Sequence, residues 1–222
     1  EYLAALLKNG QIGAEYLLAN KALPVVAYVD VPAADALTAK HTSSWGMKAL
    51  TAIVRIFGKC PEIEMQEKPK KAALSSWRSA KSLYLYTHLF DRGSPVQARG
   101  FDHAIPLYLL PLKETQREYL MHWAQSYRNH DEIWIGSGAL EVQAYKQLAD
   151  PTSELSKEGR EHCAELEAIT KKPTYYFLLR YYGRRRGEDT RRCPLCSKPW
   201  ATQRRSGEPL QFDAFAFQCD RC

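Results

Sequence analysis

The residues best suited to chemistry are four cysteines at the C-terminal end of the chain. They form two Cys-x-x-Cys pairs, at 193–196 and 219–222, with 22 residues between them. Two such pairs at this separation are typical of a four-cysteine zinc site. The predicted ligands of one Zn²⁺ are Cys193, Cys196, Cys219 and Cys222. Since four protein ligands leave no open coordination position, we expect this zinc to be structural and not catalytic.

Two other kinds of site also use this motif. A redox-active pair normally lies at the start of a helix after a strand, and one pair is enough. An iron–sulfur cluster can use four cysteines. The aromatic residues near and between the two pairs favour zinc, because they can form the small apolar layer of a zinc ribbon. These residues are Trp200, Phe212, Phe215 and Phe217.

The other two cysteines, Cys60 and Cys163, stand alone in the sequence. A secreted disulfide framework is usually shorter and denser in cysteine. Paired cysteines together with isolated thiols therefore indicate a metal site in a reducing cytoplasm. No apolar run approaches the ~18–20 residues that span a bilayer, so we expect no membrane insertion.

The positive charge of the chain is concentrated at its C-terminal end. Residues 171–222 carry twelve Lys and Arg against five Asp and Glu, a net +7, while residues 1–170 carry nineteen against twenty, a net −1. Four thiolates around one Zn²⁺ would reduce the tail to roughly +5. Such an asymmetry indicates a polyanionic partner.

Much of this positive charge comes from arginines that flank the cysteine pairs. Arginine binds phosphate through paired hydrogen bonds and stacks on bases. We therefore expect the tail to bind RNA or DNA. The candidate nucleic-acid contacts are Arg184, Arg185, Arg186, Arg191, Arg192, Arg204 and Arg205. Two alternatives use the same residues: a plain solvated surface, or an adaptor that docks on a large nucleoprotein assembly.

The elements that would position these residues form a mixed α/β body. Periodicity and capping signals predict an α+β fold of 222 residues, with a body at 1–182 and a zinc ribbon at 183–222. Because the chain ends inside the motif, we expect the ribbon to be truncated at its C-terminal end. The predicted strands are 12–18, 23–29, 82–90 and 174–182, and the predicted helices are 1–8, 45–57, 113–127, 137–148 and 154–170.

An enzyme in the body is the competing functional class. The polar loop at 91–103 is the best place for an active site, but no Gly-rich phosphate loop, nucleophile elbow or His-x-x-x-His motif accompanies it. We therefore assign no catalytic residue and no small-molecule substrate. The acid/base candidates considered are His88, Asp91, Asp102, His103, His130, Asp131 and Glu132. Alternation also places Tyr84, Tyr86 and His88 on one strand face, and Tyr176, Tyr182 and Arg180 on another. Such faces belong more often to a core than to a base-stacking platform.

From about residue 82 onward the sequence resembles an uncharacterised bacterial family of zinc-ribbon proteins with a suggested role in nucleic-acid binding. The most specific stretches are 105–111 (IPLYLLP), 155–160 (LSKEGR), 173–176 (PTYY), 193–196 (CPLC) and 217–222 (FQCDRC). Family members often carry a further cysteine pair before the Pro-Leu-Tyr segment, whereas this chain has no cysteine at 98–103. The resemblance implies a zinc site at the same four cysteines and nothing more specific.

Overall fold

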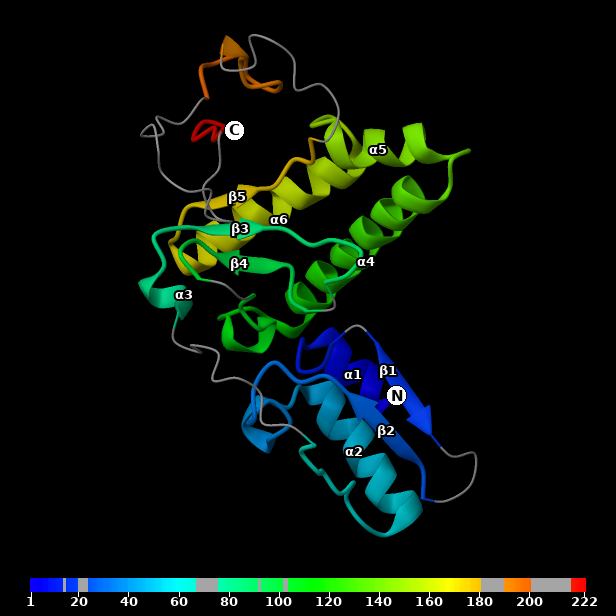
Figure 1. Cartoon of the computed structure of the whole chain (residues 1–222). Helices are drawn as coiled ribbons and strands as arrows, with labels where there is room; N and C mark the ends of the chain where they lie inside the picture. The colour runs from blue at the N-terminus through cyan, green and yellow to red at the C-terminus, as the bar shows by residue number, and fades with distance from the viewer. Residues whose placement is uncertain are drawn as a thin grey trace.

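The structure is a computed structural model that describes residues 1–13, 15–19, 24–66, 76–91, 93–101, 104–180, 190–200 and 217–222. Its helices and two small sheets make the protein α+β, as the sequence predicts. The sheet-bearing body lies between an N-terminal group of elements and the C-terminal cysteine segment (Figure 1). The predicted boundary at 182/183 lies outside the described residues and stays a prediction. None of the helices in the described ranges is long and apolar enough to cross a membrane.

A three-stranded sheet forms the centre of the body. Its order is β4 (Val96–Ala98), β3 (Leu83–Leu85) and β5 (Thr174–Tyr176), with β3 antiparallel to β4 and parallel to β5. Leu83, Tyr84 and Leu85 are all buried, so both faces of the middle strand are covered. Tyr84 therefore belongs to the core, as predicted, and does not present a stacking surface.

The predicted strands at 82–90 and 174–182 were too long, since only three residues of each pair in the sheet. The prediction of an unbroken polar loop after residue 90 was also wrong, because β4 lies within it and is fully buried. Pairing of β3 with β4 ends where Tyr86 N–H donates to Pro95 O at 2.9 Å. Beyond that point β3 has no neighbouring strand within the described residues to continue the ladder.

Three helices lead from the β3–β4 hairpin to β5: α4 (Glu114–Gly136), α5 (Glu141–Ala149) and α6 (Glu154–Thr170). The last has the predicted bounds, and the Ser153 hydroxyl caps it by accepting Ser156 N–H at 3.1 Å. Helix α4 is longer than predicted and α5 begins four residues later than predicted. The helices lie along one side of the sheet (Figure 1), where Trp123, Tyr127 and Leu166 are almost fully buried.

Helix α6 approaches β5 most closely at Gly159. A Cβ atom at this position would lie 2.6 Å from Cδ2 of Tyr176 and closer still to Cε2, and 3.1 Å from Nε1 of Trp123. The same indole donates a hydrogen bond to Leu155 O at 3.1 Å. Glycine is therefore required here by space and not by backbone conformation.

The N-terminal elements are α1 (Tyr2–Lys8), the antiparallel hairpin of β1 (Tyr16–Ala19) and β2 (Val26–Val29), and α2 (Ser44–Phe57). The hairpin and both helices are present as predicted, but its strands are shorter than predicted: β1 begins at Tyr16 and not at 12, and β2 begins at Val26 and not at 23. Gly58 ends α2 with φ +75°, the left-handed conformation that glycine adopts without strain. The remaining short elements are η1 (Ala39–His41), α3 (Ser76–Ser79) and η2 (Leu107–Leu109).

Helix α4 joins these N-terminal elements to the body. The Glu114 carboxylate accepts hydrogen bonds from the Ser44 N–H at 2.6 Å and the Ser44 hydroxyl at 2.7 Å, and so binds the start of α2. One turn later Glu118 forms an ion pair with Lys8 of α1. Both contacts come from one edge of α4, so this helix contacts the N-terminal elements as well as the sheet.

Candidate metal centre

The first cysteine pair lies in a tight turn that the backbone closes twice. Ser197 N–H donates to Cys193 O at 2.9 Å, and Cys193 N–H donates to Lys198 O at 2.9 Å. Ser197 has φ +57°, a left-handed conformation that turns the chain back after the second cysteine. Arg192 then pairs with Pro199 as an antiparallel bridge, so the two ends of the turn lie side by side.

The second pair directs backbone N–H groups at a sulfur. Burial opposes ionisation of Cys219, but the N–H groups of Arg221 and Cys222 donate to its Sγ and lower its pKa to about 7. The pKa of Cys222 is raised, first by burial and then by its contacts with the neighbouring sulfur atoms. One thiol of the pair thus ionises readily, whereas adding further negative charge beside it is unfavourable.

The two turns bring all four sulfur atoms together. The Sγ atoms of Cys193, Cys196, Cys219 and Cys222 lie within 4.8 Å of one another. The short separations are 3.4 Å for Cys193–Cys222, 3.5 Å for Cys196–Cys219 and 3.3 Å for Cys219–Cys222. Four sulfur atoms bound to one tetrahedral metal ion at about 2.3 Å lie about 3.8 Å apart, so a cluster with these separations could hold one metal ion.

A disulfide does not explain the cluster. The S–S bond is about 2.0 Å long, far below the 3.3 Å between Cys219 and Cys222. All six cysteines are thiols. The four sulfur atoms form a donor set that could hold one metal ion, and they belong to the four cysteines that the sequence predicts as ligands.

Aromatic packing and one backbone hydrogen bond join the two turns outside the sulfur cluster. The rings of Trp200 and Phe217 lie 5.0 Å apart at an interplanar angle of 32°. Beside them, Gln218 N–H donates to Trp200 O at 2.7 Å. Half of the predicted apolar layer is therefore in place, whereas Phe212 and Phe215 lie outside the described residues.

The second cysteine turn also binds the edge strand of the body. The Tyr175 hydroxyl donates to Asp220 Oδ1 at 2.7 Å and accepts Gln218 Nε2–H at 3.0 Å. Arg99, one residue after β4, donates to Gln218 Oε1 at 3.0 Å. Gln218 Nε2–H also donates to Asp220 Oδ1 at 2.6 Å, and this bond, followed by that of Tyr175, lowers the pKa of Asp220. Burial followed by the Asp220 carboxylate raises the pKa of Tyr175 to about 12. Sequence reasoning missed this network, since its members are ordinary polar residues far apart in the chain.

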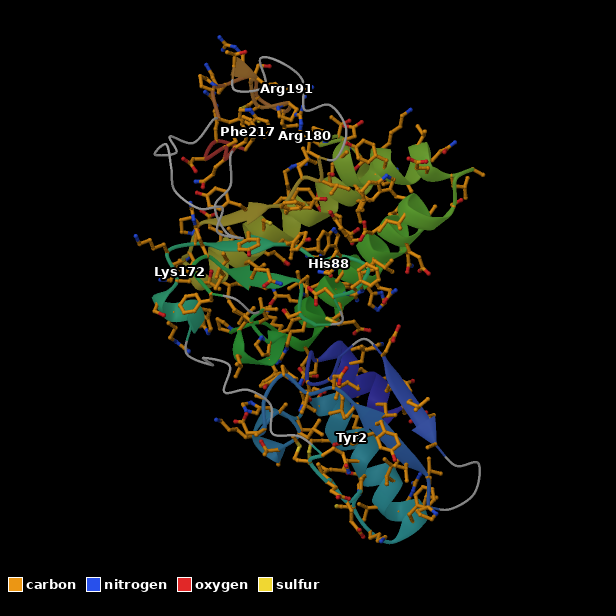
Figure 2. All side chains as sticks on the ribbon, viewed as in Figure 1. Tyr2, His88, Lys172, Arg180, Arg191 and Phe217 are labelled. Atoms are coloured by element: carbon orange, nitrogen blue, oxygen red, sulfur yellow. The ribbon has the colours of Figure 1, made fainter. Side chains whose placement is uncertain are left out.

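The structure describes only part of the predicted basic surface. Arg191 and Arg192 are exposed beside the first cysteine turn, and Arg192 also donates to Ser197 O at 3.1 Å. In Figure 2, Arg191, Phe217 and Arg180 are all at the end of the molecule opposite Tyr2. The other candidates, Arg184, Arg185, Arg186, Arg204 and Arg205, lie outside the described residues.

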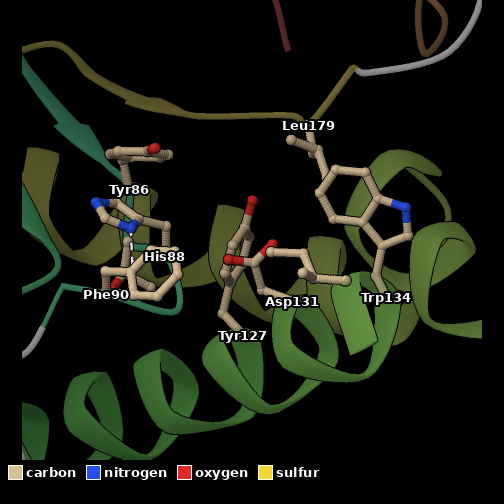
Figure 3. A pocket seen from close by; sticks show the side chains of 9 residues that line it. Tyr86, His88, Phe90, Tyr127, Asp131, Trp134 and Leu179 are labelled. Carbon is tan, nitrogen blue, oxygen red and sulfur yellow. Dashed lines mark hydrogen bonds between the residues drawn. The ribbon is translucent and has the colours of Figure 1, made fainter. Parts of the chain in front are cut away.

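Of the acid/base candidates, the structure brings His88 and Asp131 to one pocket, between the segment after β3 and helix α4 (Figure 3). Asp131 Oδ2 accepts Leu89 N–H at 2.7 Å. Asp91 accepts Gly93 N–H within its own turn, His130 Nδ1 lies 2.8 Å from Ser126 O, and Glu132 is exposed. Asp102 and His103 lie outside the described residues, so the predicted 91–103 site is not assembled among the residues that can be seen.

Comparison with known proteins finds two family models that match parts of the chain, and neither has a described function. Residues 78–179 match the family model described as "Domain of unknown function (DUF2310)", and residues 183–222 match "Domain of unknown function (DUF8594)". The matches support an uncharacterised bacterial family. No solved structure matches the chain.

Two curated relatives come from Haemophilus influenzae, and both are named "Uncharacterized protein". Each is 34% identical to the chain over 140 residues, which is 62% of the chain. The aligned region spans about half of one relative, 52%, and 66% of the other.

Proposed function

We propose that this protein is a zinc-ribbon protein that binds nucleic acid through its basic C-terminal region. The observation that carries the proposal is the four-sulfur cluster, which lies inside the segment holding the whole positive charge excess of the chain. Zinc would fix the two cysteine turns against each other. The arginines around them would then form one contact surface for phosphates.

The exposed cations beside the cluster support this surface. Arg191 and Lys198 flank the first turn and Arg221 lies within the second, and all three are exposed. Because the four sulfur atoms lie within 4.8 Å of one another, these cations come from two chain segments that one metal ion would hold together. Arg192 is a poorer choice for a binding test, because its bond to Ser197 O also stabilises the turn.

The test is the salt dependence of binding, measured by fluorescence anisotropy with labelled single-stranded RNA and duplex DNA on the zinc-loaded full chain. The variant replaces Arg184, Arg185 and Arg186 with glutamine. Each phosphate contact contributes about 0.9 to the slope of log K against log salt for duplex DNA and about 0.7 for single strands. If all three arginines contact phosphate, the slope should fall by roughly 2–3.

The matched control removes three exposed cations that lie outside the C-terminal region, by replacing Lys59, Lys146 and Lys157 with glutamine. This variant should keep the slope and affinity of the unchanged protein. An equal loss of affinity in both triple variants would mean that binding depends on net charge and not on the position of the arginines. Zinc-loaded protein whose affinity hardly changes between low and moderate salt would contradict phosphate binding.

A protein-docking adaptor remains the second candidate because of the same exposed surface. A pull-down with and without nuclease treatment distinguishes an adaptor from a nucleic-acid-binding protein. Under the proposal, material bound by the unchanged chain is lost after nuclease and is not bound by the arginine variant. Partners that survive nuclease treatment and still require the arginines would favour the adaptor.

A further inference from the structure

The pocket that contains His88 and Asp131 is a recess in the body, away from the cysteine cluster. It has a volume of about 230 Å³ and opens between the segment after β3 and helix α4, with Leu179 at its rim. Figure 3 shows Tyr86, His88 and Phe90 on one side and Trp134 on the other, with Tyr127 and Asp131 between them. The volume is below the ~300–1,000 Å³ of sites for drug-sized ligands, so the recess suits a small head group.

The described lining of this recess contains an acidic side chain and no basic one apart from a histidine. Asp131 is the only charged side chain among the described lining residues, unless His88 is protonated, and no lysine or arginine is among them. Asp131 is 6% exposed, and the hydrogen bond that it accepts, from Leu89 N–H, goes to Oδ2. Its Oδ1 is thus available to a ligand. A buried carboxylate in an aromatic recess favours a positively charged ligand.

The Tyr127 hydroxyl supplies the second, independent indication of a ligand. Tyr127 is 2% exposed, and its hydroxyl has no hydrogen-bond partner among the described residues. In Figure 3 the hydroxyl points into the space between Tyr86 and Trp134. A buried hydroxyl without a partner is unfavourable, and a polar atom of a bound molecule would satisfy it.

We propose that this recess binds a small organic ammonium cation, with the aromatic rings around the charge and the Asp131 carboxylate opposite it. Ring faces attract a desolvated cation, and an ammonium with alkyl substituents also gains from the apolar walls. A hydroxyl on such a ligand would reach the Tyr127 hydroxyl. A phosphate or a nucleic-acid backbone is excluded from this recess by the buried carboxylate, so the site is separate from the basic ribbon.

Among the described residues, no lysine or arginine lines the recess. The nearest buried cation is Arg128, one turn before Asp131 on α4, and its Nη1 donates to Thr87 Oγ1 at 3.2 Å and Asp91 O at 3.5 Å. The guanidinium therefore contacts the segment after β3 and is not among the residues that line the recess. Within the described part of the chain no lysine or arginine of the lining faces Asp131, so a ligand can supply the opposite charge.

The test uses calorimetric titration of the full chain with choline and with its neutral analogue, in which carbon replaces the quaternary nitrogen. Both molecules have the same shape, so their difference in affinity measures recognition of charge. We expect saturable choline binding, and binding of the neutral analogue that is at least about tenfold weaker. This comparison needs no variant and does not depend on the folding of a mutant.

Two substitutions test whether choline binds beside the Asp131 carboxylate. Asp131→Asn keeps an oxygen that can accept Leu89 N–H and should weaken choline binding about tenfold. Glu132→Gln removes the same charge from the exposed neighbouring position on α4 and should leave binding unchanged. Equal affinity for choline and its analogue, tighter binding of adenosine than of choline, or equal effects of the two substitutions would overturn the proposal. So would the absence of saturable choline binding. None of these results bears on the zinc ribbon.

Discussion

Replacing Gly159 with alanine should destabilise the body although alanine favours helices. Gly159 lies in α6, where a Cβ atom would lie 2.6 Å from Cδ2 of the Tyr176 ring. That ring cannot withdraw easily, because the buried Trp123 indole packs against it with ring centroids 6.1 Å apart. The indole itself is fixed by its hydrogen bond to Leu155 O. The collision therefore displaces β5 relative to α6.

Two opposing free-energy changes decide the magnitude. Alanine in a helix interior is about 1 kcal/mol more favourable than glycine. Overpacking of a filled core costs about 1–3 kcal/mol, and the upper part of this range applies because the colliding group is a confined ring. The net loss of stability should be about 2 kcal/mol. For a chain of this size each 1 kcal/mol shifts Tm by roughly 2–4 °C, so Tm should fall by roughly 4–8 °C.

The assay is thermal unfolding followed by circular dichroism, with Gly136→Ala as the control. Gly136 ends α4, and a Cβ atom added there would have no described neighbour within 4 Å, so alanine should raise Tm slightly or leave it unchanged. In a Tyr176→Ala background the collision with the ring is gone and only the 3.1 Å approach to Trp123 Nε1 remains, so Gly159→Ala should lower Tm much less than in the unchanged chain. A Gly159→Ala protein as stable as the unchanged chain would refute the packing argument.

Three further predictions concern the cysteines and the ribbon. Cys193→Ser should abolish stoichiometric zinc in native mass spectrometry, whereas Cys60→Ser should keep one zinc per chain. In alkylation with iodoacetamide, exposed Cys60 should react quickly, while Cys163, whose pKa burial raises, should react only on unfolding. Tyr175→Phe removes a hydroxyl that is hydrogen-bonded to Asp220. The free energy of local opening of the second cysteine turn should fall by about 1 kcal/mol. The backbone amides of this turn should therefore exchange hydrogen faster, while the zinc content stays unchanged.

Local signals in the sequence predicted the helices best. The bounds of α6 followed from Ser153 as a cap and from the apolar spacing up to Thr170, both of which lie within the segment itself. The start of α5 was wrong because Ser137 resembles a cap, whereas its hydroxyl only accepts Leu140 N–H in a turn before the helix. A residue of the capping type at Ser137 therefore marked a turn. It would have marked the start of a helix only if the residues directly after it were helical.

Strand ends could not be predicted, because they depend on partners distant in the chain. The alternation at 82–90 continues past the point where β4 stops, and nothing in that segment records the length of its neighbour. The buried strand β4 was missed because polar residues surround Val96–Ala98 on both sides. By contrast, the four cysteines were predicted to lie together, because two cysteine pairs with this spacing indicate a shared metal ion even though the pairs are distant in the chain.

The glycine at 159 also gives a physical reason for two of the sequence stretches that resemble the bacterial family. The stretches 155–160 and 173–176 meet in space where Gly159 contacts Tyr176. The residue before this tyrosine, Tyr175, projects its hydroxyl to Gln218 and Asp220 of the second cysteine turn. Strand β5 therefore contacts the helical layer through one tyrosine and the second cysteine turn through the one before it. A change in the packing of α6 would reach the ribbon through this strand, so the Gly159→Ala variant should also weaken the bonds of Tyr175 to the cysteine turn.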